Sequence, residues 1–358
     1  STLFPYTTLF RSRTGAAGAY AHPAGHYGLR AAIAHHFAIS RGVRASADDI
    51  MITAGTQQAL DVIARTLLAP GEKIAIEDPG YQPPKGLFQA LGLRVVGIPV
   101  DRNGLVVDAL PHDVRAVYVT PSHQYPLGVA MTPPRRQALL AWADRNNAAI
   151  VEDDYDSEFK FAERPLDSLQ ALDTKGRVIY VGSFSKTLLP ALRLGFLIAP
   201  QSLRSALHKA KFVSDWHTPT LAQAALAHLI EDGEFARHIR KANKVYRERH
   251  EMLANAITRD FNDHLELIPS STGLHLAALA RAASVEQLTA VFRRAMDVGV
   301  VFQRLSVFAV GDSAQAGVVL GYGAIATGQI QEGLRRLRKC FDPLLSNASS
   351  SAPGAAQT

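Results

Sequence analysis

The segment GSFSK places an amine, Lys186, directly after small hydroxyl residues at the end of an apolar run. A lysine amine at the end of a buried strand can act as a nucleophile toward a carbonyl group. The common alternative is a lysine that extends into solvent from a loop. This segment alone does not decide between the two, so the other polar strand ends have to be considered with it.

The acidic segment IVEDDYD ends a second apolar run. Residues two apart on a strand share a face, so Asp153 and Tyr155 are expected to project together while Glu152 and Asp154 face the other way. A carboxylate held there needs a cation or hydrogen-bond donors. No HExxH spacing accompanies these acids, so we predict no metal site, and a solvated acidic loop is the alternative.

An anion could bind where a strand turns into a helix at Gly55 and Thr56. Backbone amides and the helix dipole at a helix N-terminus both favour negative charge. Ser183, Ser185 and Arg193 could add hydroxyl donors and a guanidinium. Ordinary helix capping is the alternative for the Gly-Thr turn, and a nucleotide loop is not indicated because GxxxxGK[ST] is absent.

Strand-like and helical segments alternate through the first part of the chain. The strand-like segments are DDIMITAG, EKIAIEDP, LRVVGIPV, VRAVYVTP, AAIVEDDYD, RVIYVGSF and LGFLIAP. Such alternation predicts an α/β fold, in which helices cover both faces of a mostly parallel sheet. Ligands of open α/β sheets bind at the carboxyl ends of the strands, so one crevice could collect all of these polar groups.

Length and composition predict two domains in a reducing compartment. With 358 residues, 47% of them hydrophobic, the chain exceeds a usual single core. We expect a non-native leader outside the domain at 1–19, a large domain at 20–205, a smaller α+β domain at 206–342 and a disordered tail at 343–358. The single cysteine, Cys340, and the lack of an apolar run long enough to span a bilayer predict a cytoplasmic protein with no membrane partner. A net charge of +6 spread along the chain gives weak support for nucleic-acid binding.

Taken together, the polar strand ends supply a lysine nucleophile, an aspartate for a protonated ring nitrogen, a tyrosine donor, an aromatic ring and a phosphate cradle. This is the set of groups that pyridoxal phosphate requires. The lysine forms a Schiff base with its aldehyde, and the aspartate keeps the pyridine nitrogen protonated so that the ring accepts electrons.

The chain resembles the fold-type I pyridoxal-phosphate enzymes of the class I/II aminotransferase superfamily. It is similar in particular to the aminotransferase-like domain of MocR/GabR-type regulators of the GntR family. The motifs that carry this resemblance are YxxxxGxxxLR from Tyr20, TAGTQQAL, EDPGY, TPSHQYPLG, EDDYDSEF and GSFSKTLLPALRLG. The resemblance implies the aspartate aminotransferase-like fold, with a seven-stranded, mostly parallel sheet and a smaller C-terminal domain.

The resemblance also implies a role for each matching residue. Lys186 would form the internal aldimine, Asp153 would pair with the pyridine nitrogen, and Tyr155 would donate to the phenolic oxygen. Tyr81 would stack on the ring, and Tyr20 would reach the phosphate of a second subunit in a homodimer with shared sites. The other implied cofactor-binding residues are Gly55, Thr56, Ser183, Ser185 and Arg193 around the phosphate and His123 and Gln124 in the cleft-lining motif.

Two departures from the family pattern bear on function. Val319 stands where aminotransferases carry an arginine for the substrate carboxylate, and Arg304 is a candidate substitute. The winged-helix domain through which such regulators bind DNA is missing from this chain. We therefore expect the amino acid- or amine-sensing domain of a regulator, and keep two alternatives: a free-standing aminotransferase and a degenerate dimerisation scaffold.

Overall fold

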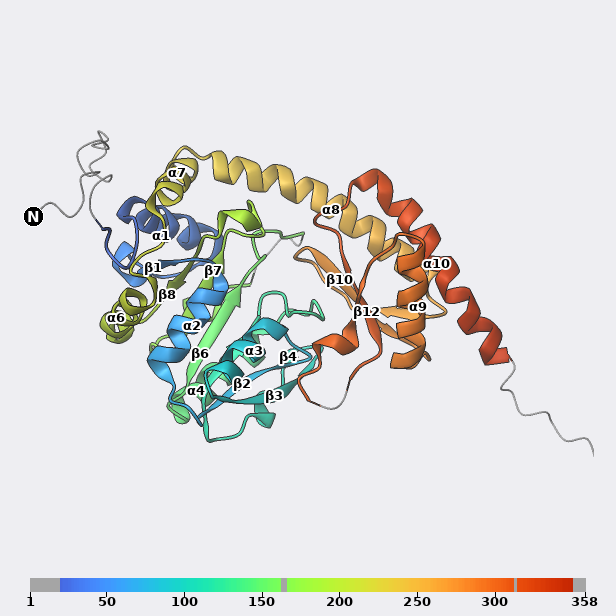
Figure 1. Ribbon diagram of the computed structural model, residues 1–358, viewed down its shortest axis with the longest axis horizontal. Coiled ribbons are helices and arrows are strands. Elements are labelled where there is room, and N and C mark those ends of the chain that lie inside the picture. The colour runs from blue at the N-terminus through green and yellow to red at the C-terminus, as the bar shows by residue number, and fades with distance from the viewer. Residues whose placement is uncertain (1–19, 162–165, 312–313, 350–358) are drawn as a thin grey trace, which may run out of the picture.

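A large sheet and a small sheet form the two halves of the protein (Figure 1). The computed structural model describes residues 20–161, 166–311 and 314–349. The leader that we expected at 1–19 and the end of the tail, 350–358, lie outside the described residues. No helix in the described part of the chain is long and apolar enough to cross a bilayer.

The large sheet has eight strands in the order β1-β8-β7-β6-β5-β2-β3-β4. β3, β2, β5, β6 and β7 run parallel to one another, whereas β8 is antiparallel to β1 and β7, and β4 is antiparallel to β3. The count exceeds the expected seven because a short β4 pairs with β3. The strands are β1 (Ile50–Thr53), β2 (Lys73–Asp78), β3 (Arg94–Asp101), β4 (Gly104–Leu105), β5 (Val114–Val119), β6 (Ala149–Asp154), β7 (Val178–Ser183) and β8 (Gly195–Ile198).

Helices cover both faces of this sheet, as the alternation of segments predicts. On one face α2 (Thr56–Leu67) and α3 (Gln82–Ala90) pack on side chains such as Val151 and Ile179. On the other face α4 (Pro133–Arg145) and α5 (Leu169–Leu172) pack on Ile150 and Val178. Adjacent residues of one strand therefore belong to different cores, because strand side chains alternate between the two faces.

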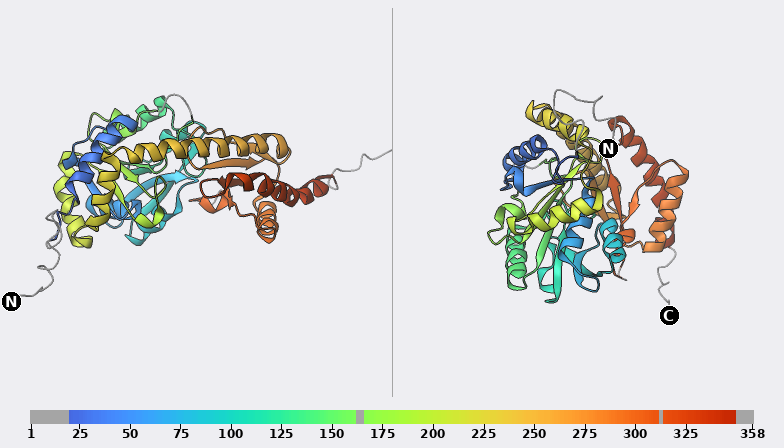
Figure 2. Two further views of the ribbon diagram at one scale, coloured as in Figure 1. Left: turned by 90° about the horizontal axis from the view of Figure 1, so that it is seen from above. Right: turned by 60° about the vertical axis from the view of Figure 1, so that its left-hand side comes forward.

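Two helices that pack on the large half lead into a third helix that reaches the small sheet. α6 (Arg204–Asp215) packs on α2, and α7 (Thr220–Glu231) packs on α1 (Tyr27–Arg41). Both helices thus contact the large half, although most of α6 and all of α7 lie beyond residue 205, where we expect the large domain to end. α8 (Glu234–Asp260) then runs from α7 to the small sheet, as the view from above shows (Figure 2).

The small sheet has the strand order β11-β12-β10-β9. Its strands are β9 (Leu265–Leu267), β10 (His275–Ala280), β11 (Gln303–Arg304) and β12 (Gly317–Gly321), and it packs with α8, α9 (Val285–Asp297) and α10 (Thr327–Ser349). α10 continues past residue 342, so the part of the expected tail up to Ser349 is helical. Short 3-10 helices are η2 (Ala47–Asp49), η3 (Val107–Ala109), η4 (Pro190–Leu192), η5 (Gln201–Leu203) and η6 (Leu305–Phe308).

Candidate functional site

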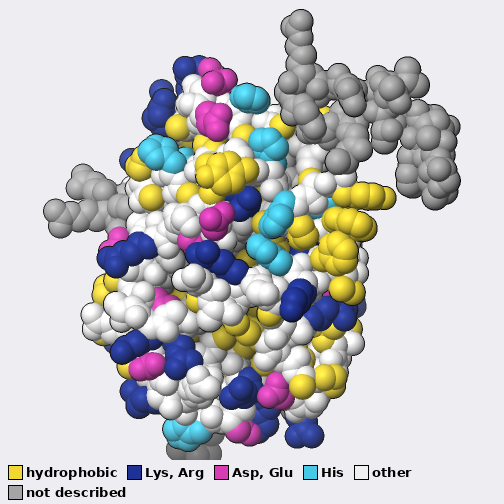
Figure 3. All heavy atoms as spheres, turned by 90° about the vertical axis from the view of Figure 1, so that its left-hand side faces the viewer, with side chains coloured by type: hydrophobic (Ala, Val, Ile, Leu, Met, Phe, Trp, Pro, Cys, Tyr) yellow, Lys and Arg dark blue, Asp and Glu magenta, His cyan; other side chains and the backbone are white. Residues whose placement is uncertain are grey.

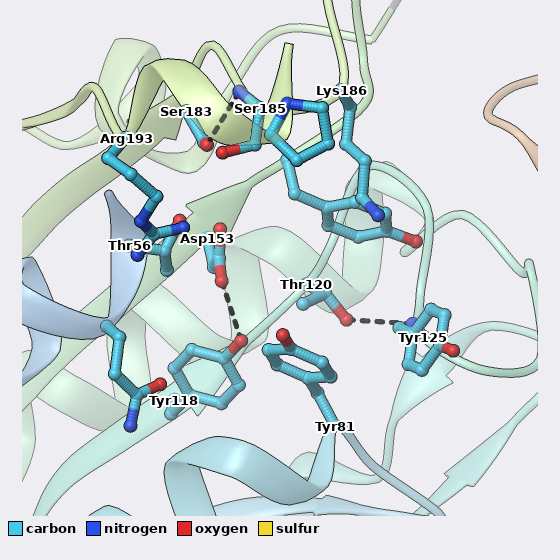
Figure 4. Close-up of a pocket in the computed structure, with 13 residues that line it drawn as sticks. Thr56, Tyr81, Tyr118, Thr120, Tyr125, Asp153, Ser183, Ser185, Lys186 and Arg193 are labelled. Atoms are coloured by element: carbon cyan, nitrogen blue, oxygen red, sulfur yellow. Dashed lines mark hydrogen bonds between the residues drawn. The ribbon is translucent and has the colours of Figure 1, made fainter. Parts of the chain in front are cut away.

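A cavity of about 340 Å³ opens at the carboxyl ends of the strands of the large sheet. Its size is in the usual range for small-ligand sites, about 300 to 1,000 Å³. Figure 4 shows side chains from β6, β7 and the loops around them pointing into it. The lining residues are Thr56, Gln57, Tyr81, Tyr118, Thr120, Tyr125, Asp153, Tyr155, Ser183, Ser185, Lys186, Pro190 and Arg193.

Asp153 stands at the end of β6 with one carboxylate oxygen paired and the other free. Oδ2 accepts a hydrogen bond from the Tyr118 hydroxyl at 2.7 Å. Oδ1 is buried and has no hydrogen-bond partner among the residues that the structure describes. Burial raises the pKa of Asp153 to about 7, although the Tyr118 hydrogen bond opposes the shift. A buried, unpaired acceptor of this kind suits a cationic N–H donor from a ligand.

The neighbouring acids face the other side of the sheet, as the strand alternation predicts. Asp154 Oδ2 accepts from Arg41 Nε at 2.6 Å and from the Tyr180 hydroxyl at 2.6 Å. Glu152 accepts from the backbone N–H of Leu169 at 2.8 Å. Arg41 and these hydrogen bonds hold the pKa of Asp154 below its ordinary value despite its burial. Asp154 therefore has a cationic partner and Glu152 has a backbone donor within the protein, although Asp154 Oδ1 is also buried without a hydrogen-bond partner among the described residues.

The turn before α2 has the features of an anion site. Gly55 is the N-cap of α2 with φ of 82°, and a Cβ added there would lie 3.0 Å from Arg193 Nη2. Arg193 Nη2 in turn donates to the carbonyl of Ala54 at 3.0 Å. Because a helix leaves its first amides without intrahelical acceptors, an anion near Thr56 would meet these N–H groups and the guanidinium together.

Lys186, Ser183 and Ser185 line the cavity together with Asp153 (Figure 4). Ser183 ends β7 and the other two follow it, and the end of β7 lies beside the end of β6 in the sheet. Ser183 Oγ accepts from the backbone N–H of Ser185 at 3.1 Å, which fixes the turn before the lysine. The amine, the aspartate and the anion-binding turn thus meet in a single cavity.

Tyr155 lines the cavity, whereas His123 and Gln124 lie behind its wall. The Tyr155 hydroxyl donates to the carbonyl of His123 at 3.0 Å. His123 is 1% exposed, and its Nδ1 lies 2.9 Å from Asp156 Oδ2. Gln124 donates from Nε2 to the carbonyl of Pro79 at 2.8 Å. Both residues hold the loop that shapes the cavity but are not among its lining residues.

A histidine and aspartate group lies in the same region, although we expected no metal site. The ligand atoms of His123, Asp156 and His275 lie within 4.8 Å of one another, and all three residues are buried. His275 Nε2 contacts the carbonyl of Pro126 at 3.1 Å, and His123 contacts Asp156. Other polar atoms of the group have partners within the protein, whereas His123 Nε2 is buried without one among the described residues.

Several lining residues were missed by the sequence reasoning. They are Gln57, Tyr118, Thr120, Tyr125 and Pro190. Tyr118 lies on β5 and Thr120 just past its end, two positions apart, so the alternation used for β6 could have identified both. Tyr125 packs edge to face against Tyr81, with their ring centroids 5.5 Å apart.

Val319, which stands where an arginine for the substrate carboxylate is expected, lies in an apolar cluster and is not among the residues that line the cavity. Val319 on β12 is 2% exposed and packs with Leu127, Leu305 and Phe308. Arg304 does not take the place of the missing arginine, because its Nη1 donates to Thr289 Oγ1 at 2.8 Å on α9. Lys186 and Arg193 are the cationic side chains among the described residues that line the cavity.

These features fit pyridoxal phosphate. The buried free oxygen of Asp153 suits a protonated pyridine nitrogen, and the turn at Gly55 with Arg193 suits a phosphate. The amine of Lys186 is within the same cavity and suits an aldehyde. The site therefore offers a partner for the ring nitrogen, the phosphate and the aldehyde of this cofactor.

Comparison with known proteins also points to a pyridoxal-phosphate protein. The aminotransferase class I and II family model matches residues 9–326. The HTH-type transcriptional regulator YhdI of Bacillus subtilis is 37% identical over 97% of this chain and 75% of its own length. The probable rhizopine catabolism regulatory protein MocR of Rhizobium meliloti is 37% identical over 91% of this chain and 66% of its own length.

Among solved structures, the α-aminoadipate aminotransferase LysN of Thermus thermophilus, complexed with N-(5'-phosphopyridoxyl)-L-leucine, is 31% identical with a TM-score of 0.83. The match covers 95% of this chain and 87% of that chain. Fold, site chemistry and relatives agree. The chain belongs to the aminotransferase class I and II family, and its cofactor is pyridoxal 5'-phosphate.

Proposed function

We propose that this domain binds an amino acid or amine through its cofactor and serves as the effector-sensing part of a MocR/GabR-type transcription regulator. The observation that carries the proposal is the meeting of Lys186 with the unpaired, buried Oδ1 of Asp153 in one cavity. The similarity to YhdI and MocR supports the regulatory role. Contact with DNA is assigned to a winged-helix domain outside the described residues.

The bound cofactor supplies an aldehyde that bonds to amines and a ring that accepts electrons. Lys186 provides the amine that holds it and, once released by an incoming amine, a base that can move a proton. Asp153 Oδ1 would accept a hydrogen bond from the ring N–H, Tyr155 would lie near the phenolic oxygen, and Tyr81 would stack on the ring. The proposed phosphate-binding residues are Gly55, Thr56, Ser183, Ser185 and Arg193.

We propose a homodimer with shared active sites. Hydrophobic side chains gather beside basic ones on the face formed by α1, α6 and α7 (Figure 3). Among the exposed ones, Leu221 is 85%, Val213 is 83% and Tyr20 is 68% accessible. A second copy of the chain would cover this surface, because exposed apolar patches mark interaction sites. Tyr20 would then be available to the partner's phosphate site.

A second candidate function is catalytic transfer of an amino group to a 2-oxo acid. The similarity to the aminotransferase LysN over 95% of this chain favours it. The apolar surroundings of Val319 do not, because no arginine there can clamp a substrate carboxylate. Rapid turnover of an amino donor with a 2-oxo acid would favour the enzyme, whereas binding of an amine without turnover would favour the sensor.

Absorbance spectroscopy with two lysine variants tests the proposal. We expect a visible band when pyridoxal phosphate is added to the wild type, a shift of that band with some amine, and no band in Lys186→Ala. Lys160→Ala is the matched control, because burial lowers the pKa of Lys160 to about 8 and makes it the alternative nucleophilic amine. A band that survives in Lys186→Ala, or disappears in Lys160→Ala, would contradict the assignment.

A further inference from the structure

α6 contains a fully buried ammonium group that the cofactor site does not explain. The side chain of Lys211 is 0% exposed. Its Nζ forms an ion pair with Asp215 and donates to Thr218 Oγ1 at 3.2 Å. Burial lowers the pKa of Lys211, and the contact with Asp215 opposes that shift. A buried charge is costly, so a lysine at this position calls for a reason beyond filling space.

In one direction the contacts of Lys211 lead to the proposed phosphate turn. The second carboxylate oxygen of Asp215 accepts from Gln58 Nε2 at 2.7 Å. Gln58 Oε1 accepts from the backbone N–H of Ala54 at 2.8 Å. The carbonyl of Ala54 is the acceptor for Arg193. One carboxylate oxygen of Asp215 thus contacts Ala54 through the Gln58 side chain, and the other oxygen pairs with Lys211.

In the other direction the contacts lead to the start of α1. The carbonyl of Thr218 accepts from Gln223 Nε2 at 2.7 Å. Gln223 is fully buried, and its Oε1 accepts from the backbone N–H of His26 at 2.7 Å. His26 is the N-cap of α1. One continuous set of hydrogen bonds therefore joins the turn at Ala54 to the residue that begins α1.

A strained turn lies in the middle of this set. Trp216 has φ of 65° and ψ of −72°, and the N–H of His217 donates to the carbonyl of Asp215 at 2.7 Å. This is the rare γ-turn with positive φ, which a residue with a side chain adopts at a cost. The Trp216 ring stacks on Tyr20 with centroids 4.3 Å apart, so the turn also holds the first described residue of the chain.

We propose that Lys211 and Asp215 are positioning residues that hold the phosphate turn Ala54–Thr56 in its binding conformation and couple phosphate binding to the segment Tyr20–His26. The proposal rests on the proposed function, since it takes this turn as the phosphate site. The coupling is physical: a shift of the Ala54 amide would break the Gln58 and Asp215 contacts, and with them the support for Lys211, Thr218 and Gln223.

The test compares a cofactor that has a phosphate with one that lacks it. Absorbance titrations with pyridoxal phosphate and with pyridoxal are made on wild type, Lys211→Met, Asp215→Ala and Gln58→Ala. We expect each variant to bind pyridoxal phosphate about tenfold more weakly, and pyridoxal within about twofold of wild type, because only the phosphate meets the turn. Equal losses for both ligands would overturn the positioning role.

Gln58→Ala keeps the test decisive where Lys211→Met does not fold, because it cuts the link to Ala54 and leaves the buried pair intact. The matched control is Asp61→Ala, which breaks an exposed i,i+4 pair with Arg65 on α2, and it should not alter either affinity. Hydrogen exchange at residues 20–27 should slow when pyridoxal phosphate binds to wild type and not in Gln58→Ala. Unchanged exchange in wild type would overturn the coupling.

Failure of the proposed function gives a different result. If wild type shows no visible band that depends on Lys186 with pyridoxal phosphate, the cofactor assignment is wrong. If wild type shows the band and the variants retain its affinity, the cofactor site stands and the role of Lys211 and Asp215 is wrong.

Discussion

The two faces of β6 each carry a buried aspartate, but the pKa values of the two aspartates are shifted in opposite directions. On the pocket face, Asp153 keeps one buried carboxylate oxygen free, and its pKa rises to about 7. On the covered face, Asp154 pairs with Arg41 and Tyr180, and its pKa lies below its ordinary value. These acids are adjacent in the chain, so residue type does not set their roles.

This difference shows that a buried acid with a cationic partner in the protein contributes to stability, whereas a buried acid without one is available to a ligand. Asp154 has a guanidinium and a hydroxyl from residues that pack under the sheet. Each aspartate keeps one buried oxygen without a hydrogen-bond partner among the described residues, but Asp153 has only the Tyr118 hydroxyl as a partner and lines the cavity, where a ligand can supply the cation. A buried acid that has no cationic partner in the protein weakens the fold and, in a cavity, marks a functional position.

The largest effect should come from the covered face. Asp154→Ala leaves the Arg41 guanidinium, whose side chain is 2% exposed, without its carboxylate. We expect the free energy of unfolding to fall by about 3 to 5 kcal/mol, as for other broken buried pairs. Urea denaturation measures the change, and Asp61→Ala, in an exposed pair with Arg65, should cost less than about 1 kcal/mol. Equal losses in the two variants would remove the contrast between the faces.

On the pocket face, function should suffer and stability should not. Asp153→Asn keeps the shape of the side chain but removes the charge that would pair with the ring nitrogen. We expect the amine-dependent change of the visible band to slow by about a hundredfold, the loss typical of a charged hydrogen bond. Stopped-flow absorbance measures the rate. Glu152→Gln, on the covered face, should leave the rate unchanged, and a similar slowing there would show that the two faces are not separate.

The pH dependence of stability should sharpen the same contrast. The pKa of Asp153 is raised from 3.8 to about 7, so the cofactor-free folded protein holds more protons than the unfolded chain between these values. Its contribution to stability is therefore lost as pH rises through this window, with a slope up to about 1.4 kcal/mol per pH unit. Glu77 and Glu152, whose pKa values also rise to about 7, act in the same direction.

Only the difference between wild type and Asp153→Asn isolates this residue. Denaturation of both proteins without cofactor, from pH 5 to pH 8, should show the wild type losing stability relative to the variant as pH rises. Asp154 acts in the opposite sense, because its lowered pKa contributes stability that is lost as pH falls. Parallel curves of stability against pH for the two proteins would show that folding does not raise the pKa of Asp153.

The site was predictable where it depends on strand alternation and strand ends. The alternation at β6 placed Asp153 and Tyr155 on the pocket face, and the structure confirms it. The same reasoning could have identified Tyr118 on β5. It could not separate His123 from Tyr125, because both lie in an irregular loop where no period applies.

The sequence by itself determined the alternation of strands and helices, and hence which polar residues stand at the carboxyl edge of the sheet, because side-chain direction in a strand repeats every two residues. Only the tertiary structure decided what lies opposite that edge. Arg304 turns toward α9, Val319 is buried, and Lys211 reaches toward the phosphate turn through Asp215 and Gln58. These contacts join segments far apart in the chain, so they depend on how α6 and the small sheet pack, which local patterns do not contain.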